Sequence, residues 1–467
     1  MSNGCEAGGQ YFSNPVSIFI NDLADEIRKT KIGLILNQTT KNQNNENQKN
    51  PTEKDLFLNI LLYADDIVLM ASQETDLQFL LNIVENWCRK WRLEVNLAKT
   101  NVMHVRNTRC PQSKFMFLFN CRTVNYCNSY KYLGATLDEF LNFDKTAEIQ
   151  AEAAGRALGA LITKTIKSGG FPFSIYSMLF ESTVCSVSDY GAEIWGFESR
   201  DAISKIHLRA ARCFLGLPKN ATSAGVLSEM NWPEPVYRAQ VRMVRQYFRI
   251  VKMNETRLTK KIHLWDKAFS EIHNIQTWSS EIRDILLTHN LLNYFDPEVN
   301  PCSQSVIVKL KESMSVKQCI ELQNICQEKP KLRTFVTFKE FGVTPSYITM
   351  PMSFIKRKFL ALSRLSNLSI RLETGRYERP RLDENQRLCQ TCNDGISIEN
   401  EYHIYFQCTV YNVMRRSWIS TLIVPENFFE LQAAEKFKLI FNKPENVKVT
   451  AQYILDAFNK RSKIVNI

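Results

Sequence analysis

The clearest pattern of apolar and polar positions lies between residues 56 and 91. Residues Leu56–Ala71 form two short apolar runs separated by the adjacent carboxylates Asp65 and Asp66. This pattern is typical of a β-hairpin with acids at its tip. The following segment, Gln73–Trp91, repeats apolar residues at helical spacing and predicts a helix. Its apolar face would consist of Leu77, Leu80, Leu81, Val84, Cys88 and Trp91.

The flanking segments predict less regular structure. Residues 4–36 are mixed apolar with a helical pattern, whereas Asn37–Asn50 is a tract of Asn, Gln and Lys that cannot bury apolar area. We therefore expect a disordered, exposed insertion at 37–50. Three short strands are expected after the helix, at Leu93–Val95, Asn101–Val105 and Tyr130–Leu137.

The pattern becomes helical after about residue 140, with Gly and Pro breaks at 169–172, 216–218 and 232–235. We expect an α+β, predominantly helical protein. Its expected parts are a mixed region at 1–140, a helical domain at 141–261, a helical connector at 262–345, and a basic segment with a Cys/His cluster and C-terminal helices at 346–467.

Composition narrows the class of protein. The chain has 467 residues, of which 44% are hydrophobic and 23% charged, as in ordinary globular proteins. Because no apolar run reaches membrane-spanning length and the start lacks a secretion pattern, we expect no membrane association and an intracellular location, in nucleus or cytoplasm. The net charge of +11 favours a polyanionic partner.

Asp65 and Asp66 form the first candidate site. Ionised carboxylates side by side repel each other, and a divalent cation held by both would relieve that repulsion. Nucleotidyl transfer uses two hard cations with oxygen ligands of this kind. On spacing alone, an ordinary solvated Asp-Asp turn explains the pattern equally well.

The second candidate site is Cys389-x2-Cys392-x10-His403-x4-Cys408. Three thiolates and an imidazole suit tetrahedral zinc, and Asp394–Gly395 offers a turn between the two halves. A closed four-ligand site implies a structural Zn²⁺ rather than a catalytic one. The alternative is a chance cluster of reduced thiols, since the 13 cysteines occur without a secretion signal.

Two basic stretches complete the candidates. The first has 4-3-4 helical spacing, with an apolar stripe one position earlier, and consists of Arg238, Arg242, Arg245 and Arg249. The second runs from Lys356 to Arg381 and includes Arg376 and Arg379. Such rows contact phosphates in nucleic-acid-binding proteins, although solvated helix faces show the same pattern.

Four segments in order resemble the reverse transcriptases of non-long-terminal-repeat (LINE-type) retrotransposons. They are Tyr63-Ala-Asp-Asp66, Trp91–Thr100 with its Asn-x-x-Lys-Thr signature, Tyr130–Leu137, and Tyr190–Gly196. The resemblance implies a polymerase palm in which Asp65 and Asp66 hold Mg²⁺ and Lys99 lies near the phosphates of the incoming nucleotide. It also implies a thumb-like helical domain at 141–261, RNA and DNA as partners, and a zinc knuckle near the end, preceded by Arg371–Pro380.

The sequence also departs from the family's pattern. In the family's template-contacting segment, which resembles Gly4–Leu23, the usual Arg-Gln pair is Glu6-Ala7 and the usual Ser-Pro pair is Phe12-Ser13. The resemblance starts at this segment, so we expect the fingers and the strand with the other metal-binding aspartate to be missing or supplied by a complementing chain.

We therefore expect a truncated RNA-directed DNA polymerase that is not active alone, which leaves its status as an enzyme open. Two alternatives remain: a non-catalytic nucleic-acid-binding remnant that uses the basic helices and the zinc knuckle, and a helical scaffold whose charge is only surface.

Overall fold

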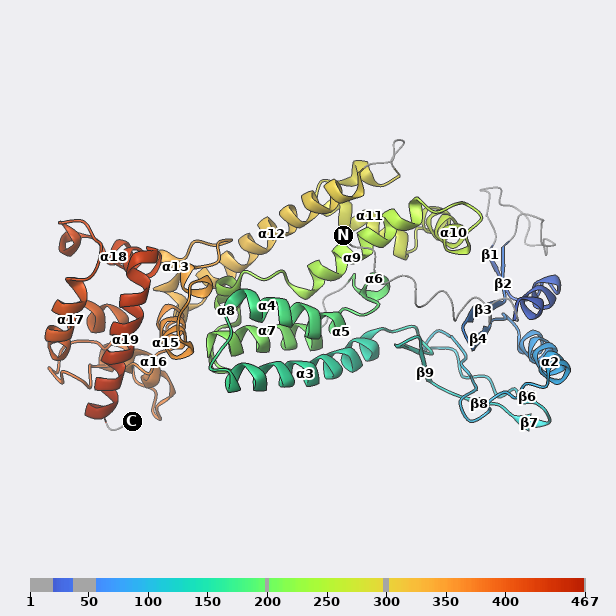
Figure 1. Cartoon of the computed structure of the whole chain (residues 1–467), viewed down its shortest axis with the longest axis horizontal. Coiled ribbons are helices and arrows are strands. Elements are labelled where there is room, and N and C mark those ends of the chain that lie inside the picture. Colours follow the sequence, from blue (N-terminus) through green and yellow to red (C-terminus); the bar gives the residue numbers. More distant parts are fainter. Residues whose placement is uncertain (1–19, 37–55, 198–200, 297–301, 466–467) are drawn as a thin grey trace. The chain divides into compact units, whose positions relative to one another are not determined.

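The computed structural model describes residues 20–36, 56–197, 201–296 and 302–465. The chain forms two compact units, which we treat separately (Figure 1). Unit 1 comprises Met1–Thr146 and Val244–Phe295, and unit 2 comprises Ala147–Met243 and Asp296–Ile467. The expected disordered insertion at 37–50 and the first part of the expected template-contacting segment lie outside the described residues.

Unit 1 contains short strands in two-stranded sheets. Four pairs are antiparallel (β1–β2, β3–β4, β6–β7 and β9–β10), and β5–β8 is parallel. The strands are β1 (Leu34–Leu36), β2 (Leu56–Leu58), β3 (Ile60–Tyr63), β4 (Asp66–Leu69), β5 (Asn101–Val102), β6 (Leu118–Phe119), β7 (Arg122–Thr123), β8 (Asn125–Tyr126), β9 (Ser129–Tyr132) and β10 (Ala135–Asp138).

A helix over residues 20–29 and helix α2 (Glu74–Trp91) build the core of the first part of unit 1. Acidic residues in the first turn of α2 and basic residues in its last turn complement the helix dipole. The expected apolar face is correct except at its end, where Trp87 is buried and Trp91 is 41% exposed. The expected strand Leu93–Val95 is wrong, because α2 ends at Arg92 in a left-handed conformation and an irregular segment follows.

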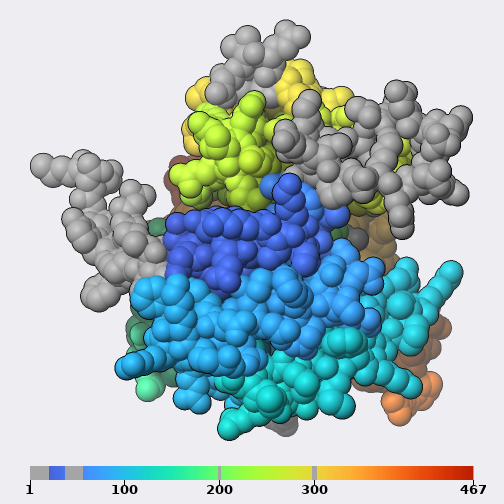
Figure 2. All heavy atoms as spheres, turned by 90° about the vertical axis from the view of Figure 1, so that its right-hand side faces the viewer, coloured from blue at the N-terminus to red at the C-terminus, as the bar shows by residue number. Residues whose placement is uncertain are grey.

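In the space-filling view, residues 20–36 lie directly against residues 56 onward and form one continuous surface with the segment up to about residue 140 (Figure 2, dark blue to cyan). The second part of unit 1 contains α10 (Leu258–His273) and α11 (Trp278–Thr288). Thr277 caps α11, since its side chain accepts a hydrogen bond from the backbone N–H of Ser280.

Unit 2 is helical. Helix α3 begins in unit 1, and helix α9 ends in unit 1. The α-helices are α3 (Asp144–Lys167), α4 (Phe173–Leu179), α5 (Ser186–Ser188), α6 (Ala192–Trp195), α7 (Asp201–Leu215), α8 (Ser223–Met230), α9 (Pro235–Val251), α12 (Ser303–Gln327), α13 (Phe335–Phe338), α14 (Ser346–Thr349), α15 (Phe354–Arg364), α16 (Arg371–Thr374), α17 (Asn412–Ile419), α18 (Ala433–Phe441) and α19 (Pro444–Val465).

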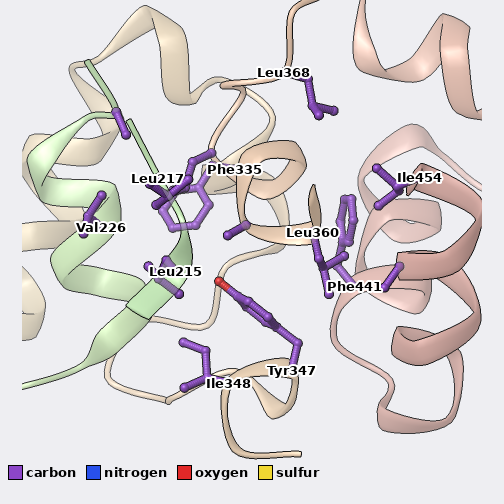
Figure 3. Close-up of a cluster of buried hydrophobic side chains, with 14 of the residues drawn as sticks. Leu215, Leu217, Val226, Phe335, Tyr347, Ile348, Leu360, Leu368, Phe441 and Ile454 are labelled. Atoms are coloured by element: carbon purple, nitrogen blue, oxygen red, sulfur yellow. The ribbon is translucent and has the colours of Figure 1, made fainter. Parts of the chain in front are cut away.

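One apolar core runs through unit 2, from Ala154 of α3 to Phe458 of α19. Figure 3 shows Val226 of α8, Leu360 of α15 and Ile454 of α19 among its side chains. Burial of apolar area contributes about 25 cal/mol per Å², so this cluster stabilises the unit. The core therefore joins segments that the sequence assigns to the helical domain, the connector and the Cys/His region.

The predominantly helical α+β class expected from the sequence is confirmed. No helix within the described residues is both long and apolar enough to cross a bilayer.

Candidate functional site

The Tyr-Ala-Asp-Asp segment forms the expected hairpin. Strands β3 and β4 pair so that Tyr63 lies opposite Asp66, and a two-residue turn of Ala64 and Asp65 joins them. Ala64 has a φ of 51°, as this tight hairpin turn requires at its first position. Both carboxylates are exposed at the tip. The pattern of two apolar runs broken by acids is thus explained by local structure.

A buried amide that the sequence did not single out anchors the hairpin. Asn59 is 2% exposed, and its Nδ2 donates to the carbonyls of Ile27 at 3.1 Å and Ile32 at 2.9 Å. The backbone carbonyl of Asn59 accepts a hydrogen bond from the backbone N–H of Met70. Gly33 makes this approach possible, because a Cβ there would lie 2.7 Å from the Cβ of Asn59. Asn59 therefore ties the strands to the preceding helix and fixes where the acids emerge.

The hairpin tip offers two carboxylates to a metal ion, and no further potential metal ligand lies with them among the described residues. Among the described residues, no third His, Cys, Asp or Glu joins Asp65 and Asp66 in a group of potential metal ligands. Asp22 is engaged elsewhere, since it accepts hydrogen bonds from the indole N–H groups of Trp87 at 2.9 Å and Trp91 at 3.1 Å. Desolvation raises the pKa of Asp22, but these hydrogen bonds outweigh it and lower the pKa overall. Asp22 is thus a structural tie.

The Tyr130–Leu137 segment forms a second hairpin, β9–β10. Its turn consists of Leu133 and Gly134, both with positive φ. Burial raises the pKa of Tyr132, and the negative charge of Asp66 raises it further, so this hairpin lies near the acids. Lys99 is exposed in a turn, where its carbonyl accepts from the Tyr130 hydroxyl at 3.4 Å. Lys99 makes no ion pair with Asp65 or Asp66 within the described residues.

The four residues of the expected zinc site come together in unit 2. The ligand atoms of Cys389, Cys392, His403 and Cys408 all lie within 4.8 Å of one another. The Cys392 Sγ is 3.5 Å from the His403 Nε2. Cys389, His403 and Cys408 are buried, and Cys392 is half-buried. Three sulfur atoms and an imidazole nitrogen at this separation could hold a metal ion.

A local turn follows the first two cysteines. Leu388 and Ile398 form an antiparallel bridge, and the chain reverses at Asp394–Gly395, as expected. The Asp394 carboxylate accepts hydrogen bonds from the Ser397 hydroxyl and from the backbone N–H groups of Ser397 and Ile396. These bonds hold the pKa of Asp394 well below its usual range. They close the turn that returns the chain after Cys392 and places Ile398 beside Leu388.

A fully buried carboxylate behind the cluster was missed from the sequence. Glu399 accepts two hydrogen bonds from Arg461 of α19, at 2.9 and 2.8 Å, and one from the Thr391 hydroxyl at 3.1 Å. The Cys389 Sγ lies 3.8 Å from the same carboxylate. Because Glu399 and Arg461 are 62 positions apart, no local pattern could reveal the pair.

The first basic stretch follows α9 but is not a uniform surface. Arg242, Arg245 and Arg249 are exposed. The expectation is wrong for Arg238, whose Nε and Nη2 donate to the buried carboxylate of Asp189 at 3.0 and 3.1 Å. Its side chain is only 18% exposed, so Arg238 is a structural ion-pair residue and the exposed row has three arginines.

The second basic stretch is also divided. Arg379 is exposed, whereas Arg376 is largely covered and lies 3.2 Å from Glu373. Arg357 and Arg364 are 3% and 1% exposed. The basic stretch Lys356–Arg381 therefore does not present all its cations to solvent, because Arg357 and Arg364 belong to the interior of unit 2.

Comparisons with known proteins agree with the motifs. Residues 3–137 match the family model described as reverse transcriptase (RNA-dependent DNA polymerase). The chain is 23% identical over 168 residues to an RNA-directed DNA polymerase from the mobile element jockey, and 26% identical over 166 residues to a probable RNA-directed DNA polymerase from the transposon BS, both of Drosophila melanogaster. It is 30% identical over 139 residues to a putative transposon-derived protein of Caenorhabditis elegans.

These matches concern part of each protein. They cover 34%, 33% and 29% of this chain, and 18%, 18% and 48% of the respective relatives. No solved structure matches the chain. The hairpin with Asp65 and Asp66 lies within the matched region. Residues 3–137 therefore belong to the reverse transcriptase family, of the type found in non-long-terminal-repeat (LINE-type) mobile elements.

Proposed function

We propose that the region 1–140 contains part of a polymerase palm in which Asp65 and Asp66 bind Mg²⁺, and that the chain does not copy RNA into DNA by itself. The observation that carries this proposal is the β3–β4 hairpin, which presents two adjacent exposed carboxylates without a third acidic ligand among the described residues. Magnesium binds through one or two carboxylates while keeping several waters, so the tip suits one hydrated ion.

When bound, Mg²⁺ would supply charge stabilisation for nucleotidyl transfer. The chain's own contribution is positional. Asn59 fixes the base of the hairpin, and the Ala64–Asp65 turn aims both carboxylates outward. Complete two-metal chemistry needs a further acid, which must come from outside the described residues.

Primer extension on an RNA template tests the proposal directly. The full chain with Mg²⁺ and a DNA primer should give no extension above that of an Asp65→Asn, Asp66→Asn variant, which removes both charges at nearly constant volume. Extension that disappears in this variant would overturn the proposed inactivity. Metal binding itself is read from Mn²⁺, which should broaden the NMR signals of residues at the hairpin tip in the parent chain only.

We also propose that the Cys/His cluster binds one structural Zn²⁺. The close approach of four soft ligands, three of them buried, supports this assignment. Elemental analysis of protein purified under reducing conditions should give about one zinc per chain. A His403→Ala variant should lose the metal, and retention of full zinc content by that variant would contradict the ligand set.

A second role, nucleic-acid binding, is favoured by the exposed row of α9. Arg245 and Arg249 make no ion pair within the described residues, and Arg242 only a long one with Asp189, at 3.9 Å. Arg242 and Arg249 are seven positions apart, which is about 10 Å along a helix and compatible with neighbouring phosphates. We propose that RNA and DNA bind to this row, to Arg379 and, to a lesser degree, to Arg376.

The proposed domain layout has three further parts. They are the thumb-like domain at 141–261, the connector at 262–345 and the zinc-containing segment at 346–467.

A further inference from the structure

A groove in unit 2 lies beside a buried arginine that none of the features above uses. The turn Gly169–Pro172 lines one side and the segment Thr349–Met352 lines another, together with Phe354 and Arg357 of α15. Its volume is about 220 Å³. Sites for drug-sized ligands measure roughly 300–1,000 Å³, so this groove suits a smaller molecule. We call it the Arg357 groove.

Arg357 is held firmly on one edge and unsatisfied on the other. Its Nε donates to the carbonyl of Phe214 at 3.1 Å, and its guanidinium stacks 4.0 Å from the centroid of the Phe214 ring. Its Nη2 is buried and has no hydrogen-bond partner. The residue is 3% exposed. Arg357 therefore brings a guanidinium N–H group without a hydrogen-bond partner to the lining of the groove.

The charge of Arg357 also lacks a partner. Arg357 forms no ion pair within the described residues, and the ionisable groups that face it are Tyr176, Cys213 and Tyr347. Burial raises the pKa of each of these groups, so all three are neutral at pH 7. A buried cation without a compensating anion is unfavourable, because it has lost its hydration. An anion in the groove would remove that cost.

The shape of the groove favours close approach to this edge. Gly170 has a φ of 107°, and a Cβ there would lie 3.7 Å from the Arg357 Nη2 and 3.3 Å from the Cβ of Phe354. Glycine thus keeps a side chain from filling the space beside Phe354 and the guanidinium. A carboxylate matches the planar fork of arginine, and the surrounding Phe171, Met350 and Met352 side chains suit an apolar body.

We propose that the Arg357 groove binds a small organic carboxylate, with the acid group on the outer edge of Arg357 and the apolar body against Phe171, Met350 and Met352. The proposal is independent of the polymerase and zinc assignments, since it uses none of their residues.

The test is a titration of the full chain, labelled with ¹³C at its methionine methyl groups, with benzoate. The Met350 and Met352 signals, assigned from Met→Leu variants, should shift saturably. Benzamide has the same shape without the charge and should bind at least tenfold more weakly. An Arg357→Gln variant should lose the benzoate response, whereas Lys356→Gln, which removes a charge from the same helix outside the groove, should keep it.

Each other outcome overturns the proposal. Equal shifts with benzamide would show that the groove is only apolar. Equal affinity for inorganic phosphate or chloride would show a site for any small anion. A site with a Kd of about 0.1 mM would be almost fully occupied at about 10 mM benzoate. If the two methionine signals do not shift at that concentration, the carboxylate does not bind. Should Arg357→Gln fail to fold, the comparison of benzoate with benzamide on the parent chain decides the question alone.

Discussion

The buried ion-pair cluster around Glu229 allows a quantitative test of what stabilises unit 2. Glu229 and Arg364 are both fully buried and pair through two hydrogen bonds, at 2.8 and 3.0 Å. Glu229 also accepts from the Tyr347 hydroxyl at 2.5 Å and lies 3.8 Å from the Lys339 Nζ. One carboxylate thus compensates two buried cations.

This arrangement makes the two partners unequal. Glu229→Gln keeps the shape but leaves Arg364 and Lys339 without their carboxylate, and breaking a buried pair costs about 3–5 kcal/mol. Arg364→Met leaves Glu229 paired with Lys339 and Tyr347. We therefore expect this variant to lose about 3 kcal/mol of unfolding free energy or less. The double variant should lose less than the sum of the two single variants, because they share one interaction.

The assay is hydrogen exchange of peptides from α15, which reports opening of unit 2 separately from unit 1. Burial alone would raise the pKa of Glu229, but Arg364 and Lys339 outweigh it and lower the pKa below the ordinary 4.5. The advantage of the parent chain over Glu229→Gln should therefore be complete above about pH 4.5 and shrink as the pH falls through the lower folded value. Equal losses for both single variants, or a larger one for Arg364→Met, would refute the reasoning.

Four further outcomes follow from the structure. Burial lowers the pKa of Lys339 to about 8, so the stability of the parent chain relative to Lys339→Met should rise between about pH 8 and 10.5, as measured by urea unfolding. Asp22→Ala removes two indole hydrogen bonds at an exposed site and should cost about 0.5–1.5 kcal/mol in unit 1, with no change in exchange of unit 2 peptides. Arg245→Ala should flatten the log-log salt dependence of RNA affinity by roughly 0.7–0.9, whereas Arg238→Ala should chiefly lower the melting temperature; the reverse assignment would contradict the structure. Zinc chelation should increase hydrogen exchange around Cys408 and leave the hairpin of unit 1 unchanged, and equal effects on both would count against a local site.

The features that could be predicted from the sequence are those whose structure depends on residues close together in the chain. The β3–β4 hairpin follows from two apolar runs around Asp65 and Asp66, and α2 follows from its apolar repeat. The Cys389 and Cys392 pair and the turn at Asp394 are likewise local. In each case a few consecutive side chains and backbone angles determine the structure, so periodicity and turn chemistry suffice.

The errors concern partners that are far apart in sequence. Arg238 and Arg364 look like surface residues until Asp189, 49 positions away, and Glu229, 135 positions away, are brought beside them. Trp87 and Trp91 lie four positions apart on the same face of α2, but Trp91 is the last residue of the helix and stays 41% exposed while Trp87 enters the core. Charge patterns alone cannot separate a solvated arginine from one whose carboxylate comes from another helix.

The single core of unit 2 has a consequence for synthesis of the chain on the ribosome. Helices α7 and α8 place apolar side chains against partners such as Leu360 and Phe441, which emerge more than a hundred residues later. Arg461 of α19, which neutralises the buried Glu399, emerges later still. The apolar faces of the earlier helices therefore stay exposed until these later partners have been synthesised. Exposed apolar faces make a nascent chain prone to aggregation. Nascent chains stalled before α19 should depend on chaperones, and a premature stop codon at residue 444 should yield protein that is degraded rather than a smaller stable domain.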